Sequence, residues 1–205
     1  PERRGENRRM GGKCPVTIGV LGYQGGVEPH VRMVERCGAR AVIVRDRASL
    51  DAAAALILPG GESTTLGRLL RRFGLDGPVL ERIANGMPVF GTCAGLILMA
   101  RRVIGGDPSP LACLDVTVER NAFGRQTESF VAGVRLGGFA DPVRGVFIRA
   151  PYIKEAGPRV EVWGTYEGRI VAARQGHLWG AAFHPELTDD TRVHRSFIAY
   201  VEERL

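Results

Sequence analysis

Residues 87–102 read M-P-V-F-G-T-C-A-G-L-I-L-M-A-R-R and set one cysteine at a corner between two apolar segments. The apolar residues at 88–90 predict the end of a buried strand, and the proline-free residues 94–102 predict a helix. Between them, Gly-Thr-Cys-Ala-Gly at 91–95 has the Gly-X-nucleophile-X-Gly form of a nucleophile elbow, whose glycines avoid collisions between a Cβ and the neighbouring strand or helix. We therefore expect Cys93 in a strained turn, with the Ala94 N–H facing the place where an oxyanion would form.

The segments around this corner alternate between strand and helix patterns. Three near-continuous apolar runs are typical of central parallel strands buried on both faces, at residues 16–21, 41–44 and 56–58. Three helix patterns accompany them, at 27–37, 62–72 and 78–85. Ser63 is the expected N-cap of the second helix, and a short alanine-rich segment is expected to open at Asp51. The alternation predicts an α/β fold with an open, mostly parallel twisted sheet and helices on both faces.

After residue 102 the pattern changes to shorter strands separated by turn residues. We expect these strands at 116–118, 129–131, 143–148, 160–163, 170–173 and 178–183, with a polar loop at 119–128 and a closing helix at 193–205. They would add short antiparallel strands to the sheet in the C-terminal half. With no repeat and no clear linker, residues 14–205 are expected to form a single domain.

Composition limits the class of protein. The chain has 205 residues, of which 44% are hydrophobic and 24% are charged, which is ordinary for a soluble domain. No apolar run approaches the length of a membrane span. Residues 1–13 are expected to be a disordered leader or a segment foreign to the natural chain. Their five basic and two acidic residues supply +3 of the formal +6, so nucleic-acid binding is not expected.

Four cysteines are present, without a Cys-X-X-Cys pair or a cysteine–histidine cluster at zinc spacing. A metal site and a disulfide framework are therefore not expected, and a reducing cytoplasm fits the thiols better. Most cysteines are small buried hydrophobic residues, so the elbow alone does not make Cys93 a nucleophile.

A second informative stretch is Phe-His-Pro-Glu-Leu at 183–187. His184 ends an apolar strand, so its ring is expected at the same sheet edge as Cys93. Glu186 can return through the turn at Pro185 to hydrogen-bond that ring and fix its tautomer. A histidine–glutamate pair by itself is more often a surface ion pair. Its coincidence with the elbow makes a nucleophile, a base and an orienting carboxylate available together.

Glycine-rich loops follow the first and third predicted strands, at 22–26 and at Pro59-Gly60-Gly61. Ligands bind at this edge of an open α/β sheet. Neither Gly-X-Gly-X-X-Gly nor a phosphate-binding P-loop sequence is present, so we expect no nucleotide and no cofactor. The backbone N–H groups after Pro59 could supply a second oxyanion donor, although a plain strand-to-helix turn has the same sequence signature.

The elbow and His184-Pro185-Glu186 together resemble the class I, triad-type glutamine amidotransferases, a family with a flavodoxin-like fold. Further stretches are similar to the glutaminase subunits of pyridoxal 5′-phosphate synthases: P-G-G-E-S-T-T at 59–65, R-N-A-F-G-R-Q at 120–126, F-I-R-A-P at 147–151 and F-H-P-E-L-T at 183–188. The resemblance runs from about residue 18 to near the C-terminus.

This resemblance implies hydrolysis of L-glutamine to glutamate and ammonia. Cys93 would attack the side-chain amide, His184 would move the proton, and Glu186 would orient His184. The Gly61 and Ala94 N–H groups would hold the oxyanion. The family pattern further implies that glutamine is bound by Gly61, Glu62, Ser63, Arg120, Ile148 and Arg149. Arg120 also suits an α-carboxylate on chemical grounds, as a permanent cation with a planar fork of donors.

The resemblance also implies a partner, a synthase subunit that receives the ammonia. Such glutaminases assemble with it in a complex of twelve synthase and twelve glutaminase subunits, and Gln24 matches a family position near that interface. No nucleic acid and no membrane is implied, and the location would be cytoplasmic.

Two departures from the family pattern stand out. Val27-Glu28-Pro29-His30 replaces the usual Val-X-Glu-His, and His177 occupies a position where an amide residue is more usual. Three histidines, His30, His177 and His194, are expected at the surface or behind the residues that contact the substrate.

Two alternatives stay open. One is another amidotransferase glutaminase or a cysteine hydrolase on a similar scaffold, against which the 120–126 and 147–151 stretches argue. The other is a small-molecule-binding or chaperone-like α/β protein with a redox-sensitive cysteine, which would have no need of His184 and Glu186. Alkylation by a glutamine-analogue electrophile would separate them, because only a glutaminase should be labelled selectively at Cys93.

Overall fold

The computed structural model describes residues 14–106, 109–120 and 129–205. The expected leader at 1–13 lies outside these residues, as do most of the loop expected at 119–128 and the part of the 120–126 stretch that follows Arg120.

Five parallel strands form the first half of the sheet, in the order β2-β1-β3-β4-β12. They are β1 (Thr17–Leu21), β2 (Arg40–Val44), β3 (Ala55–Leu58), β4 (Val89–Thr92) and β12 (Leu178–Ala181). The first four are the predicted apolar runs. The last comes from the far end of the sequence and pairs with β4 in the middle of the sheet.

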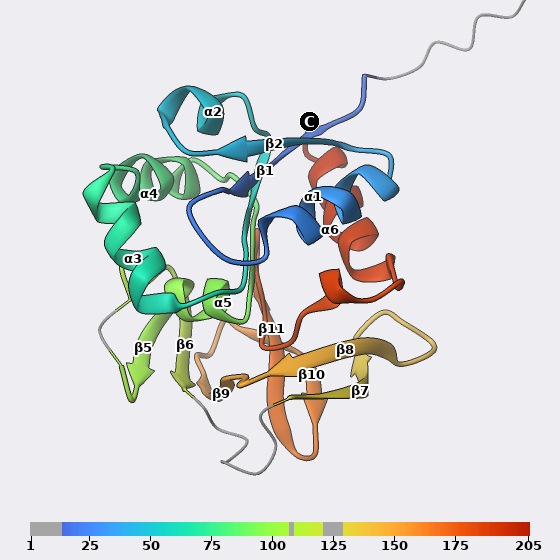
Figure 1. The fold of residues 1–205 in the computed structure, drawn as a ribbon. Helices are drawn as coiled ribbons and strands as arrows, with labels where there is room; N and C mark the ends of the chain where they lie inside the picture. Colours follow the sequence, from blue (N-terminus) through green and yellow to red (C-terminus); the bar gives the residue numbers. More distant parts are fainter. Residues whose placement is uncertain (1–13, 107–108, 121–128) are drawn as a thin grey trace, which may run out of the picture.

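Helices cover both faces of these strands (Figure 1). On one side lie α1 (Val27–Arg36) and α6 (Arg192–Glu202), and on the other lie α3 (Ser63–Arg72), α4 (Asp76–Ala84) and α5 (Ala94–Met99). Covering on both sides explains why the strands are apolar on both faces rather than alternating.

The sheet continues from β12 into an antiparallel part in the order β12-β11-β10-β7-β8. Its strands are β7 (Ser129–Leu136), β8 (Val143–Ile148), β10 (Glu161–Tyr166) and β11 (Arg169–Gln175). A side branch consists of β5 (Ala100–Ile104), β6 (Leu114–Glu119) and β9 (Tyr152–Ala156), and β9 joins it to β11. The predicted fold class, a mostly parallel sheet with added antiparallel strands in the C-terminal half, is confirmed.

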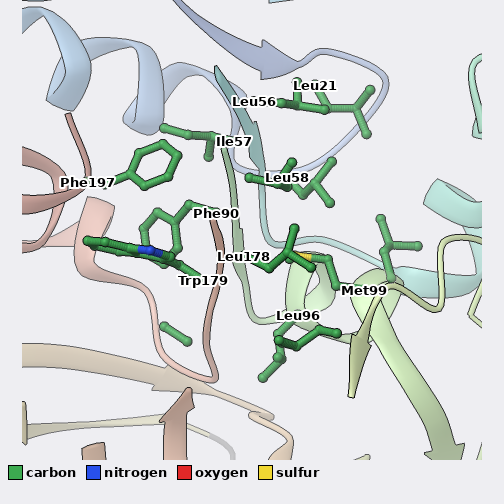
Figure 2. Packing of buried hydrophobic residues seen from close by; sticks show 14 of the residues in the cluster. Leu21, Leu56, Ile57, Leu58, Phe90, Leu96, Met99, Leu178, Trp179 and Phe197 are labelled. Atoms are coloured by element: carbon green, nitrogen blue, oxygen red, sulfur yellow. The ribbon is translucent and has the colours of Figure 1, made fainter. Parts of the chain in front are cut away.

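The core packs against both faces of the central strands (Figure 2). On one face, the Phe197 ring of α6 lies 5.6 Å from the Phe90 ring and 5.4 Å from the Trp179 ring, measured between centroids. On the other, Leu96 and Met99 of α5 are fully buried. Because β4 and β12 are held from both sides, the chain segments that leave their carboxyl ends start from fixed positions.

The helix after the elbow is shorter than predicted, ending at Met99 instead of residue 102. Ala100 already has an extended backbone, and β5 pairs in parallel with β6. The two arginines expected to close the helix lie in this strand, where Arg101 forms an ion pair of 3.1 Å with Asp115. Pairing with a distant strand has overridden the local helix preference.

Two local predictions at helix ends were wrong. The N-cap of α3 is Glu62 and not Ser63, because the Glu62 carboxylate accepts hydrogen bonds from the N–H groups of Thr64 (3.0 Å) and Thr65 (2.7 Å). Asp51 ends a helix instead of opening a segment: α2 (Arg47–Asp51) starts from the Asp46 cap. Strand β9 and the 3-10 helix η1 (Pro185–Leu187) were not predicted.

Replacing Gly95 by alanine should lower the stability of the folded protein. A Cβ at this position would lie 1.9 Å from the Leu58 carbonyl oxygen, a backbone atom that cannot move aside as a flexible side chain can. We expect Gly95→Ala to lower the free energy of unfolding by about 3 kcal/mol in urea titrations. Gly77→Ala in α4 is the control, because nothing lies within 4 Å of its added Cβ. It should leave stability unchanged or raise it by up to about 1 kcal/mol, and equal losses in both variants would contradict the argument.

Candidate active site

A cavity of 530 Å³ opens at the carboxyl ends of the parallel strands. Its lining includes every residue that the sequence analysis assigned to the site: Gln24, Gly61, Glu62, Ser63, Cys93, Ala94, Arg120, Ile148, Arg149, His184 and Glu186. These residues come from segments far apart in the sequence, which the strand order of the sheet brings to one edge.

Cys93 lies in the turn between β4 and α5, with φ 49° and ψ −104°. This backbone conformation is rare for residues other than glycine. The turn is held because the Cys93 N–H donates to the Ala181 carbonyl at 2.8 Å, at the end of β12. An added Cβ on Gly91 would lie 2.6 Å from the backbone of Gly95. The two glycines therefore let β4 and α5 approach closely enough to form the corner.

His184 and Glu186 form a buried pair beside Cys93. His184 Nδ1 lies 2.7 Å from Glu186 Oε1, and each residue is less than a tenth exposed. The backbone N–H of His184 donates to the Val146 carbonyl at 2.7 Å. Pro185 then begins η1, whose turn brings Glu186 back toward the His184 ring. The Cys93 thiol lines the same cavity as the His184 ring and raises the pKa of that ring. The Nδ1 proton therefore belongs to the bond with Glu186, which leaves Nε2 for the sulfur.

The two groups stabilise each other's charged form. Burial alone would lower the pKa of His184, but its hydrogen bonds with Cys93 and Glu186 raise it above the ordinary imidazole value. Burial alone would raise the pKa of Glu186, but the nearby imidazoles of His30 and His184 hold it below the ordinary carboxyl value. Since burial lowers the pKa of His30 and keeps that ring neutral, we attribute the ionised state of Glu186 chiefly to His184.

The glycine pair after β3 forms the opposite wall of the cavity. An added Cβ on Gly60 would lie 2.3 Å from Cε1 of His184, so only glycine allows this approach. The Gly60 carbonyl accepts from the Gly26 N–H at 3.0 Å, and the Gln24 side-chain oxygen accepts from the Glu62 N–H at 3.1 Å. Gln24 therefore fixes the glycine-rich segment from within the cavity.

A charged pair lies at the more exposed end of the cavity. An Arg120 guanidinium nitrogen lies 3.5 Å from Oε1 of Glu62, whose carboxylate also caps α3. The hydrogen bonds from Thr65 and Thr64 and the charge of Arg120 lower the pKa of Glu62 to about 2, so it is ionised at neutral pH. The site thus offers one fixed cation next to one fixed anion.

The remaining wall comes from the end of β8. Ile148 is partly exposed into the cavity, and Arg149 has a left-handed backbone with φ 41°. Such a conformation is unfavourable for arginine by about 1 kcal/mol or more. Both residues belong to the cavity lining, as do the two glycines.

The sequence analysis missed a cluster behind the site. His30 and His194 are completely buried behind the site, which is one of the two positions expected for them, and Thr92 joins them through a hydrogen bond of 3.0 Å to His30. The signal was present for one of them: His30 has helical spacing to the buried residues Met33 and Val34. His177 lies partly buried, 3.0 Å from the Ile83 carbonyl, outside the cavity.

The described part of the chain holds neither a cluster of metal-binding side chains nor a membrane-spanning helix. Within it, no three His, Cys, Asp or Glu side chains are placed to hold a metal ion together. In the same residues, no helix has the length and apolar character needed to cross a membrane.

The backbone strain at Cys93 should appear as a difference in stability between variants at this position. Cys93→Gly should be more stable than Cys93→Ala by about 1 kcal/mol, because glycine adopts this φ and ψ without strain. Thermal unfolding at one pH would show this as a melting temperature about 2–4 °C higher for the glycine variant. At Cys113, which has no positive φ, the alanine variant should instead be more stable than the glycine variant. An alanine variant at Cys93 as stable as the glycine variant would contradict the strain.

The buried pair should make stability depend on pH at both ends. Because the Glu186 pKa is lowered, its contribution is present above the ordinary carboxyl pKa of 4.5 and is lost as pH falls. Because the His184 pKa is raised, its contribution is complete below the ordinary imidazole pKa of 6.5 and is lost as pH rises. Urea titrations should therefore show that Glu186→Gln costs most, about 2 kcal/mol, between pH 4.5 and 6.5. A cost that does not vary with pH would contradict this.

Comparison with known proteins agrees with this geometry. A sequence model of the SNO glutamine amidotransferase family matches residues 20–203. The chain is 56% identical over 188 residues to the pyridoxal 5′-phosphate synthase subunit PdxT of Geobacillus thermodenitrificans, covering 92% of this chain and 96% of that protein. It is 52% identical, with the same coverage, to PdxT of Bacillus licheniformis.

Solved structures show the same architecture. A crystal structure of a glutamine amidotransferase superposes with a TM-score of 0.86 at 43% identity, covering 90% of this chain and 98% of that one. The structure of PurLQS from Thermotoga maritima has a TM-score of 0.71 at 16% identity, covering 92% of this chain and 100% of that one, and shows the shared fold alone. From the family match and from relatives more than half identical along nearly their whole length, the chain belongs to the SNO glutamine amidotransferase family.

Proposed function

We propose that this protein is the glutaminase subunit of a pyridoxal 5′-phosphate synthase and hydrolyses L-glutamine to L-glutamate and ammonia. The observation that carries the proposal is the placement of Cys93 and the hydrogen-bonded His184–Glu186 pair in the lining of one cavity. The names of the relatives, subunits of pyridoxal 5′-phosphate synthase, supply the pathway.

Cys93 acts as the nucleophile in this proposal. Its sulfur forms a bond to the side-chain amide carbon of glutamine, and His184 takes the thiol proton and passes it to the departing ammonia. Water then adds to the resulting thioester with His184 as base, which releases glutamate and restores the thiol. Glu186 keeps the His184 ring in the required orientation and tautomer.

The oxyanion of each tetrahedral intermediate is held by the Ala94 and Gly61 N–H groups. Ala94 is the first residue of α5, so its N–H has no partner within the helix. Gly61 lies on the facing wall of the same cavity. Loss of one such donor raises the activation barrier by roughly 3 kcal/mol.

The charged end of the cavity binds the amino-acid head of glutamine. An α-amino acid carries a carboxylate beside an ammonium group, and Arg120 and Glu62 present the opposite charges side by side. Arg120 takes the α-carboxylate through paired donors. Ser63, Ile148 and Arg149 complete the binding site around the substrate.

Ammonia must be kept from water, because in water at neutral pH it becomes ammonium and loses its nucleophilicity. A synthase subunit docked over the cavity would receive it, with Gln24 near the interface. The assembly contains twelve synthase and twelve glutaminase subunits and works in the cytoplasm. Residues 14–205 form the glutaminase domain.

Glutamate release from L-glutamine tests the proposal, with and without a cognate synthase subunit. Cys93→Ala should lower the rate at least about a thousand-fold, because no other group can form the thioester. Cys113→Ala should keep the wild-type rate, since Cys113 lies outside the cavity. If glutamate release depends on Cys93 but does not change with the synthase, the glutaminase assignment stands and the assignment of the synthase as partner fails. Release by neither preparation would favour the binding-protein alternative.

A further inference from the structure

Two imidazoles lie behind the catalytic pair, and the proposed reaction does not use them. His30 comes from α1 and His194 from α6, and both are completely buried. His30 Nδ1 lies 2.9 Å from His194 Nε2. His30 Nε2 lies 3.0 Å from Thr92 Oγ1 and 3.5 Å from Glu186 Oε1. His30 therefore touches both the residue before the nucleophile and the acid that orients the base.

The chemistry of the partners decides which nitrogens carry protons. Ionised Glu186 only accepts hydrogen bonds, so the proton of His30 belongs on Nε2. Nδ1 of His30 is then an acceptor, and His194 must donate to it from its own Nε2. Nδ1 of His194 is left as a bare acceptor, in agreement with its lack of a hydrogen-bond partner among the described residues.

Both rings are neutral at neutral pH. Burial lowers the pKa of His30, and it lowers the pKa of His194 to about 3. The charged groups that act on the pair are Glu186 and His184. On its other side, His194 packs edge-on against the Phe90 ring, with 5.9 Å between centroids. A neutral donor can orient Glu186 without competing with His184 as a second cation.

Glu186 needs such a support. Its Oε1 faces both His184 and His30, whereas its buried Oε2 has no hydrogen-bond partner in the described part of the chain. Rotation of the carboxylate about its side-chain bonds is therefore opposed mainly at Oε1. We propose that His30, held in place by His194, is a positioning residue that fixes Glu186 for its hydrogen bond with His184. This inference rests on the proposed glutaminase function.

Kinetics of substituted enzymes test the inference. His30→Leu fills the space but removes the donor, and kcat for glutamine should fall about 10-fold or more while KM changes less than about two-fold. His30→Gln, which can place an N–H near Glu186, should recover most of the loss. His194→Leu should have a smaller effect, of about three-fold. His177→Leu is the matched control and should keep the wild-type kcat, because His177 lies outside the cavity.

Nitrogen-15 NMR of labelled histidines provides a readout that needs no glutaminase activity. The chain has four histidines, so each ring can be assigned by substitution. His30 and His194 should be neutral with the proton on Nε2 at neutral pH, and His30→Leu should shift the His184 Nδ1 proton signal.

The two measurements separate the possible failures. An unchanged His184 signal with unchanged kcat in His30→Leu would overturn the positioning role, as would an Nδ1-protonated His30 in the wild type. If the wild type releases no glutamate, the proposed function fails, and the NMR signals still decide whether His30 positions Glu186.

Discussion

The site depends on how closely α5 can approach the sheet. The Leu58 carbonyl of β3 lies where a side chain on Gly95 would start, and the backbone at Gly95 lies where a side chain on Gly91 would start. Because the backbone approaches so closely at Gly91 and Gly95, the chain turns sharply between them, at Cys93. The position of the sulfur relative to His184 is therefore set by packed backbone, which relaxes much less than side chains do.

Around that corner the cavity divides into two ends with different physics. At the end proposed for the reaction, the His184–Glu186 pair is buried, where charges interact strongly and a lost partner is costly. At the end proposed for substrate recognition, the Glu62–Arg120 pair is partly exposed, where water weakens the attraction and leaves both groups free to exchange partners. The first arrangement suits fixed geometry, and the second suits binding and release of a charged ligand.

Local signals in the sequence predicted what depends on local structure. The apolar runs gave the parallel strands, and the spacing of Gly91 and Gly95 gave the corner. The predictions that failed depend on distant segments. Residues after Met99 leave the helix because they pair with β6. Nothing in the sequence of the helix itself indicates this pairing. For His194 the sequence left open a place at the surface or behind the site, because its burial requires that α6 close over the same face as α1. The prediction of Ser63 as the cap of α3 failed for a chemical reason. The two carboxylate oxygens of Glu62 accept hydrogen bonds from two backbone N–H groups, those of Thr64 and Thr65.

The central place of β12 bears on the order of events in a growing chain. Synthesis delivers the sulfur at residue 93, but the imidazole and carboxylate that would activate it follow about ninety residues later, after the strand that must insert beside β4. Pairing over such a separation is a slow, late step in folding. A ribosome-bound or truncated chain therefore carries an unassisted cysteine, and the activation proposed for Cys93 becomes possible only when the last strand of the sheet is in place.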